Sequence, residues 1–357
     1  MSKIMQHCFG KDNSGGPVKA FHRLIQYSGF EFSVIRQLDG AGGLNLQLIK
    51  KFIKEIKKEK PNLIHIRGLG NEGFHAALAA KIAGVPKILV SIHGTHRDLV
   101  NEFHPIKRWI IVNILERITL NIATDITTVC DYANKREFLS PYKHKLRSPI
   151  PNGVPIPKLL NKTEVTELRK QIGIADTDIV GICVSRITLE KGYLVLSKAL
   201  KKIDRENNKF TLLILGGGDE DDSIKKSYSE LKYIKVKFIG QVESVNDYLS
   251  ISNFFVFPTF HENLSNALIE AMSYQLPVIA TSVGGNIEVI KKGGGVLTRA
   301  NDVDSLASSI REFVNNPDFI SKMGIQARNN IIDNYSVAKM VNSWECLYTN
   351  IIEEINE

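Results

Sequence analysis

Short apolar runs alternate with longer amphipathic segments along most of the chain. The runs have the length and composition of buried parallel strands. Those predicted as strands are Ile4–Phe9, Glu31–Arg36, Asn62–Arg67, Lys87–Ile92, Asp125–Val129, Ile179–Ser185, Thr211–Leu215, Val236–Gly240, Phe254–Phe257 and Pro277–Ala280. Helices are expected between them, for example over 50–60 and Gly73–Ala83. Such an alternation of strands and helices predicts parallel, doubly wound sheets.

A linker interrupts this alternation near the middle of the chain. The prolines around Asn152-Gly153-Val154-Pro155 and the polar residues 158–167 are typical of an interdomain segment. The closing segment, Tyr335 to Glu357, is predicted to be a helix. A chain of 357 residues is long enough for two domains of ordinary size.

The stretch 254–288 holds the densest group of candidate functional residues. Its first strand ends at Pro258, and the loop that follows carries Glu262. A helix is expected to begin near Ser265 or Asn266, because both are good N-cap residues. Polar groups therefore follow the carboxyl end of a strand, which is where open α/β sheets bind ligands.

Two glutamates in this stretch, Glu262 and Glu270, lie eight positions apart. If the whole segment were helical, about 12 Å would separate them at roughly 1.5 Å per residue. That distance exceeds the roughly 5 Å of a retaining glycosidase pair. It suits the two ends of a sugar nucleotide, with the diphosphate at the positive end of the helix. The alternative is an ordinary amphipathic helix with one solvated glutamate, preceded by a loop glutamate.

Two strings in the second half carry a specific resemblance. They are E-N-L-S-N-A-L-I-E-A-M-x-x-x-x-P-V-I-A-T-x-x-G-G-x-x-E, which begins at Glu262, and V-S-R-x-x-x-E-K-G, which begins at Val184. Both resemble signatures of the retaining glycosyltransferases of family 4, which have the GT-B fold. The chain departs from that family's pattern at Asn263 and Gln275, where glycines are usual.

The resemblance implies an α/β fold of the GT-B type, with two Rossmann-like, doubly wound parallel-sheet domains facing across a cleft. The N-terminal, acceptor-side domain would cover residues 1–155, and the nucleotide-sugar domain would cover residues 156–337. A terminal helix over about 338–357 would pack back on the first domain.

The resemblance also implies roles for individual residues. His93, in the strand end S-I-H-G, and Glu262 would be the catalytic contacts to the reacting sugar. Glu270 would hold the ribose. Arg186 and Lys191 would grip the diphosphate, since two cations can offset its charge. The whole implied donor-binding set is Gly15, Gly16, Arg186, Lys191, Gly216, Val242, Asn263, Leu264, Ser265, Asn266 and Glu270.

The implied function is retaining transfer of a sugar from a nucleotide diphosphate sugar to a hydroxyl of a saccharide acceptor. A UDP-sugar is favoured over a GDP-sugar, and the acceptor is expected to be lipid-linked, as in surface polysaccharide assembly. The donor is a co-substrate, and neither a cofactor nor a metal is expected. Two alternatives stay open: a GT-B-like sugar-nucleotide 2-epimerase and a non-catalytic sugar-nucleotide-binding subunit.

Composition and charge narrow the choice of partner and compartment. The four cysteines are scattered without the spacing of a zinc site. The chain shows neither eighteen consecutive apolar residues nor a signal-peptide core. We therefore expect a cytoplasmic enzyme. Residues 1–150 contain 23 Lys and Arg against 12 Asp and Glu, a net charge of +11; since the whole chain is +8, residues 151–357 carry −3. A basic half attracts anionic partners, and nucleic-acid-binding patterns are missing.

Residues 104–121 allow two interpretations. Trp109 and several isoleucines alternate with Lys107, Arg108 and Arg117 after the helix-starting Pro105. The segment is either a core helix packed on the sheet or a basic, tryptophan-bearing helix that touches an anionic membrane.

Two glycine-rich turns complete the candidates. Asn13-Ser14-Gly15-Gly16 is a plausible point of backbone approach to a phosphate or sugar. Gly216-Gly217-Gly218 precedes the acidic cluster 219–222 but lacks a full G-x-G-x-x-G. The acidic cluster is expected to begin a helix rather than to hold a divalent metal.

Overall fold

The computed structural model describes residues 3–11, 15–98, 104–206, 209–218 and 221–356. The chain separates into two units, each built on its own parallel sheet. Unit 1 comprises Met1–Gly153 and Val337–Glu357, and unit 2 comprises Val154–Ser336.

Unit 1 contains a five-stranded parallel sheet in the order β2-β1-β3-β4-β5. Its strands are β1 (Ile4–Phe9), β2 (Phe32–Gln37), β3 (Leu63–Arg67), β4 (Lys87–Ile92) and β5 (Asp125–Thr128). The order reverses between β1 and β3, as in doubly wound sheets of the flavodoxin type. Every residue of β3 is buried because helices cover both faces of the sheet.

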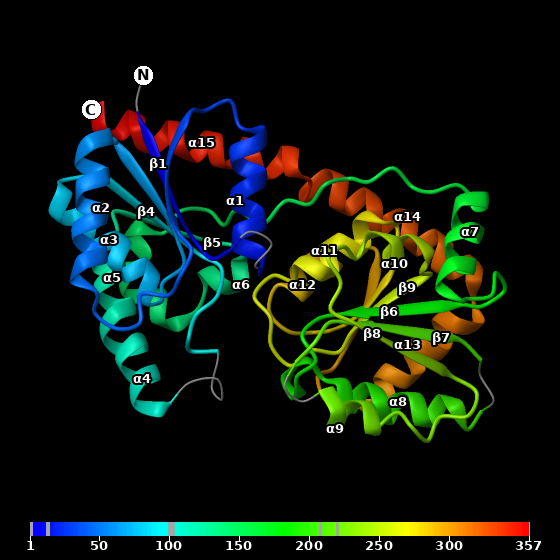
Figure 1. Ribbon diagram of the computed structural model, residues 1–357. Helices are drawn as coiled ribbons and strands as arrows, with labels where there is room; N and C mark the ends of the chain where they lie inside the picture. The colour runs from blue at the N-terminus through cyan, green and yellow to red at the C-terminus, as the bar shows by residue number, and fades with distance from the viewer. Residues whose placement is uncertain (1–2, 12–14, 99–103, 207–208, 219–220, 357) are drawn as a thin grey trace. The chain divides into compact units, whose positions relative to one another are not determined.

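Helices α2, α3 and α5 cover one face of this sheet, and α1 and α15 cover the other (Figure 1). The helical elements of unit 1 are α1 (Gly15–Tyr27), α2 (Leu46–Glu59), α3 (Asn71–Ala83), α4 (Pro105–Ile110), η1 (Ile111–Leu115), α5 (Glu116–Ile122), α6 (Asp131–Asn134), η2 (Glu137–Lys145) and α15 (Val337–Asn356). In α2 the buried residues are Ile49, Phe52 and Ile56, while most of its lysines are exposed. The helix expected over 50–60 is confirmed, and its lysines form the solvated face.

Helix α15 is fixed to unit 1 by aromatic side chains. Trp344 and Tyr348 are buried, and their ring centroids lie 4.5 and 5.8 Å from that of His65 on β3. Phe30 and Phe32 make edge contacts with Tyr348 at 6.1 and 6.0 Å. The closing segment is therefore part of the core of unit 1.

Unit 2 contains a six-stranded parallel sheet in the order β11-β10-β9-β6-β7-β8. Its strands are β6 (Val180–Val184), β7 (Thr211–Leu215), β8 (Lys235–Gly240), β9 (Phe254–Phe257), β10 (Val278–Thr281) and β11 (Gly295–Thr298). The edge strand β11 was not predicted, since its short sequence begins with the last of three consecutive glycines. The two parallel, doubly wound sheets confirm the predicted fold class.

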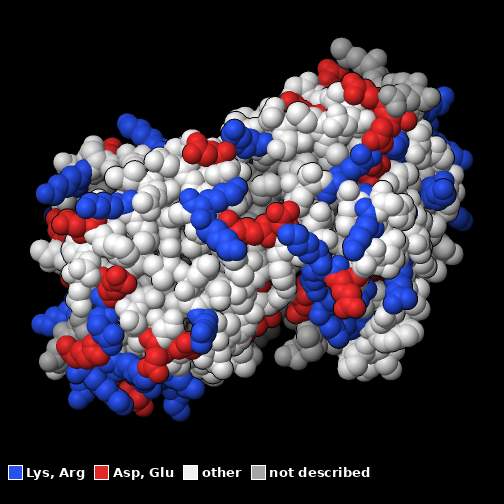
Figure 2. All heavy atoms as spheres, turned by 180° about the vertical axis from the view of Figure 1, so that it is seen from behind, with Lys and Arg blue, Asp and Glu red and all other residues white. Residues whose placement is uncertain are grey.

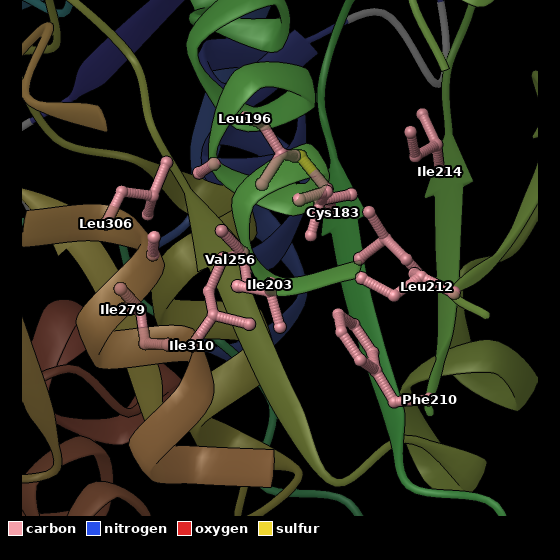
Figure 3. Close-up of a cluster of buried hydrophobic side chains, with 14 of the residues drawn as sticks. Cys183, Leu196, Ile203, Phe210, Leu212, Ile214, Val256, Ile279, Leu306 and Ile310 are labelled. Carbon is pink, nitrogen blue, oxygen red and sulfur yellow. The ribbon is translucent and has the colours of Figure 1, made fainter. Parts of the chain in front are cut away.

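Apolar side chains from both layers fill the interior of unit 2. Figure 3 shows Leu196 and Ile203 of α8 and Leu306 and Ile310 of α13 converging on strand residues such as Val256. The helical elements of unit 2 are α7 (Lys162–Ile172), η3 (Leu189–Lys191), α8 (Tyr193–Asp204), α9 (Asp221–Lys226), α10 (Asn246–Ile251), α11 (Asn266–Ser273), α12 (Asn286–Ile290), α13 (Val303–Asn315) and α14 (Pro317–Asn334).

Residues 105–122 form three consecutive helical pieces, α4, η1 and α5, of which η1 is a π-helix. Ile111, Val112 and Leu120 are buried, as the core-helix interpretation expects. On the opposite side of the segment, the side chains of Ile106 and Trp109 are 66% and 59% exposed. The core-helix interpretation thus describes one face of the segment, and a membrane contact by the exposed face stays a prediction. Among the described residues, no helix combines the length and apolarity needed to cross a bilayer.

Charged side chains of both signs are interspersed on the face that Figure 2 shows. They are dense at its lower left, over the part of unit 2 that contains α8 and α9 in Figure 1. Ion pairs such as Lys201–Glu230 at 2.7 Å and Arg311–Glu206 at 2.6 Å are largely exposed. Exposed pairs of this kind contribute little to stability.

Two buried histidines should make unit 1 sensitive to acid. Burial lowers the pKa of His7 from 6.5 to about 4 and that of His65 well below its usual value. Their contribution to stability is complete above pH 6.5 and is lost as the pH falls toward the folded-state pKa, because only the unfolded chain then binds the proton. We expect the free energy of unfolding, measured with urea, to fall less steeply between pH 7 and pH 5 in His7→Gln than in the unaltered chain. The difference in slope should be up to about 1.4 kcal/mol per pH unit. Exposed His144→Gln is the control, and equal slopes for His7→Gln and the unaltered chain would contradict the expectation.

Candidate functional site

The strand order of unit 2 reverses between β6 and β9, which pair although they lie far apart in the sequence. Ile182 of β6 is aligned with Phe255 of β9. Because the strands are parallel, both carboxyl ends meet at one edge, where the connections diverge and ligands bind in open α/β sheets. Arg186 and Lys191 follow β6 at this edge, and Glu262 follows β9.

Lys191 and Glu262 form an ion pair at this edge. The Lys191 Nζ lies 3.1 Å from the Glu262 Oε2, and the two side chains are 15% and 20% exposed. The loops are tied together by a 2.9 Å hydrogen bond from the Phe260 N–H to the Glu190 carbonyl, and the Lys191 Nζ lies 5.6 Å from the centre of the Phe257 ring. Two residues predicted from separate motifs therefore form one charged centre that solvent still reaches.

Two glycines allow the backbone segments to approach this closely. Gly192 has φ +76°, and a Cβ there would lie 1.9 Å from the Pro258 carbonyl oxygen. Gly216 has φ +137°, and a Cβ there would lie 1.8 Å from the Ser185 carbonyl oxygen. Gly192 lets the E-K-G turn pack against Pro258 at the end of β9. Gly216 lets the turn after β7 pack against Ser185, the residue before Arg186. Gly216 thus shapes the site, while a direct contact with a donor stays a prediction.

Arg186 is the most open of the predicted cations. Its Nη2 donates to the Glu190 Oε1 at 3.1 Å, and its side chain is 55% exposed. This i,i+4 pair is the ordinary surface contact that competes with a binding role. Burial does not keep a ligand from this guanidinium, because most of the side chain is exposed.

Helix α11 begins at Asn266, as predicted from the sequence. The Ser265 hydroxyl accepts a 3.2 Å hydrogen bond from the Leu268 N–H and so caps the helix. Glu262 lies in the loop before the cap and Glu270 lies inside the helix. The estimate of about 12 Å, which assumed a continuous helix, therefore does not describe this pair.

The residues between Glu262 and the helix are buried. Asn263 and Leu264 are 6% and 7% exposed, and the Asn263 carbonyl accepts a 2.7 Å hydrogen bond from the Gly285 N–H. This bond joins the loop to the second glycine turn of the motif. Val242, half-buried, follows the carboxyl end of β8. Donor contacts by these residues stay predictions.

The glycine-rich candidates of the first half lie at the start of α1. Gly15, with φ +62°, and Gly16 are its first two residues, and Asn13 and Ser14 lie outside the described residues. In unit 2, Asp219 and Glu220 are likewise outside them. Helix α9 begins at Asp221, and the described residues contain no group of three metal-ligating side chains. Metal independence stays a prediction.

His93 follows β4 at the carboxyl edge of the unit 1 sheet. Its Nε2 lies 3.3 Å from the Ser91 Oγ. Burial, reinforced by the Arg67 guanidinium, lowers the pKa of His93 to about 3, so the imidazole is neutral at physiological pH. The structure therefore gives His93 the form of a neutral hydrogen-bonding group.

The residues that follow His93 are held by contacts within unit 1. The Thr95 hydroxyl donates to Asp98 at 3.1 Å. The Arg97 Nε lies 3.1 Å from Glu116, and its guanidinium lies over the Phe138 ring at 4.6 Å. These contacts fix the loop after β4 to the helical segment that contains Glu116.

Comparison with known proteins gives the family. Residues 164–330 match the family described as Glycosyl transferases group 1, and residues 19–129 match Glycosyl transferase 4-like. The chain belongs to the group 1 glycosyl transferases.

Relatives of this glycosyltransferase span most of its length. The Escherichia coli UDP-Gal:alpha-D-GlcNAc-diphosphoundecaprenol alpha-1,3-galactosyltransferase is 27% identical over 330 residues, which cover 86% of this chain and 82% of the relative. The Staphylococcus aureus capsular polysaccharide biosynthesis glycosyltransferase CapM is 24% identical over 318 residues, covering 87% and 82%. The structure of Anabaena HepE in complex with UDP-glucose is similar with a TM-score of 0.79 at 18% identity, over 98% of this chain and 100% of that one. This likeness confirms the GT-B fold.

Glu116 and three buried polar residues of the strands were not predicted from the sequence of the glycosyltransferase. Glu116 is fully buried beside Arg97, and burial raises its pKa to about 7. Gln6, His65 and Arg67 are buried polar residues within strands β1 and β3. The available signal was a polar residue inside an otherwise apolar run, which marks a buried group that needs a partner.

An apolar pocket of about 620 Å³ lies in unit 1 beside α4 and η1. Leu44, Phe74, Ile106, Ile110 and Leu115 supply its apolar lining, and Lys107 adds a cation. The exposed side of α4 with Trp109 adjoins it in sequence. No motif predicted this pocket, because its lining comes from three separate segments.

We expect Gly192→Ala to distort the Lys191–Glu262 centre. A Cβ at 1.9 Å from a backbone oxygen, at a positive φ, should cost about 1–3 kcal/mol in the free energy of unfolding. Gly217→Ala is the matched control, because nothing lies within 4 Å of a Cβ there. Urea unfolding measures both variants. Equal stability of the two would show that the close approach at Gly192 is not required.

Proposed function

We propose that this glycosyltransferase transfers a sugar, with retention of anomeric configuration, from a nucleoside diphosphate sugar to a hydroxyl of a lipid-linked saccharide. One observation carries the proposal: the Lys191–Glu262 ion pair at 3.1 Å, where the strand order of unit 2 reverses. A cation and a carboxylate at that point match a donor in which a diphosphate adjoins a hydroxyl-bearing sugar. The start of α11 adds the positive end of a helix dipole.

The donor would be held by residues after β6 and β9. Arg186 and Lys191 offset the charge that grows on the departing diphosphate, and Arg186 can bind phosphate with two parallel hydrogen bonds. Glu262 accepts hydrogen bonds from sugar hydroxyls, and Glu270 accepts them from the ribose diol. The family resemblance implies a further contact to the transferred sugar by His93. A uridine nucleotide is favoured because the E. coli relative is named for UDP-Gal and the HepE structure contains UDP-glucose.

In the proposed step, the acceptor oxygen bonds to the anomeric carbon on the face that the diphosphate leaves. The bond from that carbon to the phosphate oxygen breaks, and the acceptor proton passes to that oxygen. The products are the extended saccharide and the nucleoside diphosphate. Because Arg186 and Lys191 supply the compensating charge, we propose that the reaction needs no divalent metal.

Removing both cations should abolish transfer and weaken the binding of a nucleoside diphosphate. We expect Arg186→Ala/Lys191→Ala to weaken UDP binding at least about 100-fold, since hydrogen bonds to charged groups contribute about 1.5–3 kcal/mol each. Isothermal titration in EDTA with UDP and GDP measures the effect and the nucleotide preference together. Lys201→Ala/Arg311→Ala removes one Lys and one Arg from exposed ion pairs elsewhere in unit 2 and should leave binding unchanged.

The same titrations can reject the proposal. Unchanged affinity in the Arg186→Ala/Lys191→Ala variant would refute the donor site. Binding or transfer that EDTA abolishes and Mg²⁺ or Mn²⁺ restores would refute metal independence alone. Conversion of the sugar nucleotide without acceptor would favour an epimerase.

The lipid-linked acceptor is supported by the surface of unit 1. The E. coli relative is named for a diphosphoundecaprenol acceptor. In this chain, Ile106, Trp109, Ile110 and Ile114 expose apolar side chains in one segment, next to the apolar pocket. Exposed Lys107 accompanies them, and residues 1–150 carry a net charge of +11. We propose that this segment touches an anionic membrane and brings the enzyme to its acceptor.

The proposed contact predicts reversible binding to anionic vesicles. Each basic residue near the surface contributes about 1 kcal/mol, which salt screens. We expect Ile106→Ser/Trp109→Ser to lose co-sedimentation with phosphatidylglycerol vesicles. Ile325→Ser/Ile332→Ser is the matched control, because it removes exposed apolar side chains from α14. Negligible binding of the unaltered enzyme to both anionic and neutral vesicles would favour a soluble acceptor.

A further inference from the structure

Three connections of unit 1 enclose its apolar pocket of about 620 Å³. Leu44 lies in the connection after β2, Phe74 in the helix after β3, and Ile110 in α4 after β4. Because the strands are parallel, these connections leave the sheet at its carboxyl edge, where open α/β sheets bind ligands. The volume is within the roughly 300–1,000 Å³ that is usual for small-molecule sites. The pocket therefore has the place and the size of a binding site.

Hydrogen bonds hold the first wall of the pocket, in residues 42–45, against α3. The Asn71 Nδ2 donates to the Gly43 carbonyl at 3.3 Å. The Asn45 N–H donates to the His75 Nε2 at 2.9 Å. These two bonds fix the loop relative to the helix that carries the pocket floor, so the first wall has a defined position.

The opposite wall, α4 with η1, is fixed to the loop after β4. The Arg108 guanidinium donates to the His96 and Arg97 carbonyls at 3.0 and 2.7 Å. The Arg97 guanidinium donates in turn to the Val112 carbonyl at 2.9 Å. Val112 belongs to η1, a π-helix, and π-helical turns are rare and frequent at functional sites. Hydrogen bonds thus hold both walls, as in sites that are largely preformed.

The lining of the pocket selects for an apolar ligand. It consists mainly of Leu, Ile and Phe side chains and two glycines, and its polar Asn71 is engaged with the Gly43 carbonyl. An extended peptide would bring backbone amides and carbonyls that need partners, and burying them unpaired is costly. A hydrocarbon chain brings no such groups. The lining therefore favours a hydrocarbon chain over a peptide.

The mouth of the pocket is apolar, open and basic. Leu44 and Ile106 line the pocket and are 68% and 66% exposed, so a chain can enter between them. Lys107 also lines the pocket and is exposed. A chain inserted from this side leaves its end group beside that cation. One cavity with a lysine at its mouth matches a lipid with one chain and a terminal phosphate better than a phospholipid with two chains.

We propose that this pocket binds the hydrocarbon chain of the lipid-linked acceptor, a single-chain lipid phosphate whose phosphate lies beside Lys107. The assignment of the chain to the acceptor rests on the proposed function, whereas the binding of a chain does not. The pocket adds to the membrane contact of the exposed side of α4, because it takes one lipid molecule out of the bilayer. Unit 1 then recognises its acceptor by the lipid.

Titration with water-soluble lipids tests the pocket without a membrane. Octyl, decyl and farnesyl phosphate are titrated calorimetrically into the whole enzyme, each below the concentration at which it forms micelles. We expect the affinity to rise roughly tenfold or more from octyl to decyl phosphate, since two more methylenes are buried. Farnesyl phosphate should bind at least as tightly as decyl phosphate, and inorganic phosphate should not bind detectably. An affinity that does not depend on chain length would overturn the proposal.

A two-chain lipid distinguishes the acceptor from the bulk membrane. We expect dioctanoyl phosphatidylglycerol to bind no more tightly than octyl phosphate, because only one of its chains can enter. Clearly tighter binding of the two-chain lipid would overturn the assignment to the acceptor and make the pocket a site for membrane phospholipid.

Ile110→Asp places a carboxylate on the pocket wall, at a side chain that is already 40% exposed. We expect it to weaken the binding of decyl phosphate at least about tenfold, because a charge would have to be buried against the chain. Ile118→Asp is the matched control, since Ile118 is 37% exposed on α5 and is not part of the lining. Leu44→Asp repeats the test on the opposite wall if Ile110→Asp does not fold. Equal affinities in the wall variants and in Ile118→Asp would overturn the proposal.

UDP titrated into the same unaltered enzyme separates this inference from the proposed function. The proposed donor site belongs to unit 2, so its binding is measured independently of the pocket. Binding of UDP without binding of lipid phosphates would refute the pocket alone. Binding of lipid phosphates without binding of UDP would refute the donor site, and with it the assignment of the chain to an acceptor.

Discussion

The pairing of β6 with β9 is the constraint on which the candidate site depends. These strands come from distant parts of unit 2, yet their parallel alignment brings two strand ends to one edge of the sheet. The E-K-G turn after one strand and the His261-Glu262 loop after the other can then touch. Gly192 permits that contact, because a side chain at this position would overlap the Pro258 carbonyl. Backbone packing therefore permits the charge pairing of Lys191 with Glu262.

The Lys191–Glu262 pair balances two opposite charges at this edge of the sheet. The Glu262 carboxylate lies 3.1 Å from the Lys191 ammonium, and both side chains keep some exposure. The proposed binding of a diphosphate to the ammonium and of sugar hydroxyls to the carboxylate requires that exposure. Arg186, whose side chain is 55% exposed, adds a second cation without a burial cost.

Unit 1 uses buried polarity in a different way. Its sheet is covered on both faces, and a line of hydrogen-bonded side chains lies within that buried interior: Arg67, Gln6, Tyr348, His65 and Ser91. Each member is satisfied by the next, which limits the cost of burying it. Because α15 contributes Tyr348, the last helix of the sequence becomes part of this network as well as of the apolar core.

The sequence by itself determined the alternation of strands and helices, the start of α11 at its serine cap and the family motifs, because each depends on residues close together in the chain. It also marked Lys191, Glu262 and His93 as separate candidates. Only the tertiary structure decided that Lys191 pairs with Glu262, that Gly216 packs on Ser185, that an apolar pocket adjoins α4, and that Tyr348 connects to His93 through His65 and Ser91. The strand order produced these contacts, and no local pattern encodes which distant strands become neighbours or which buried polar groups then satisfy one another.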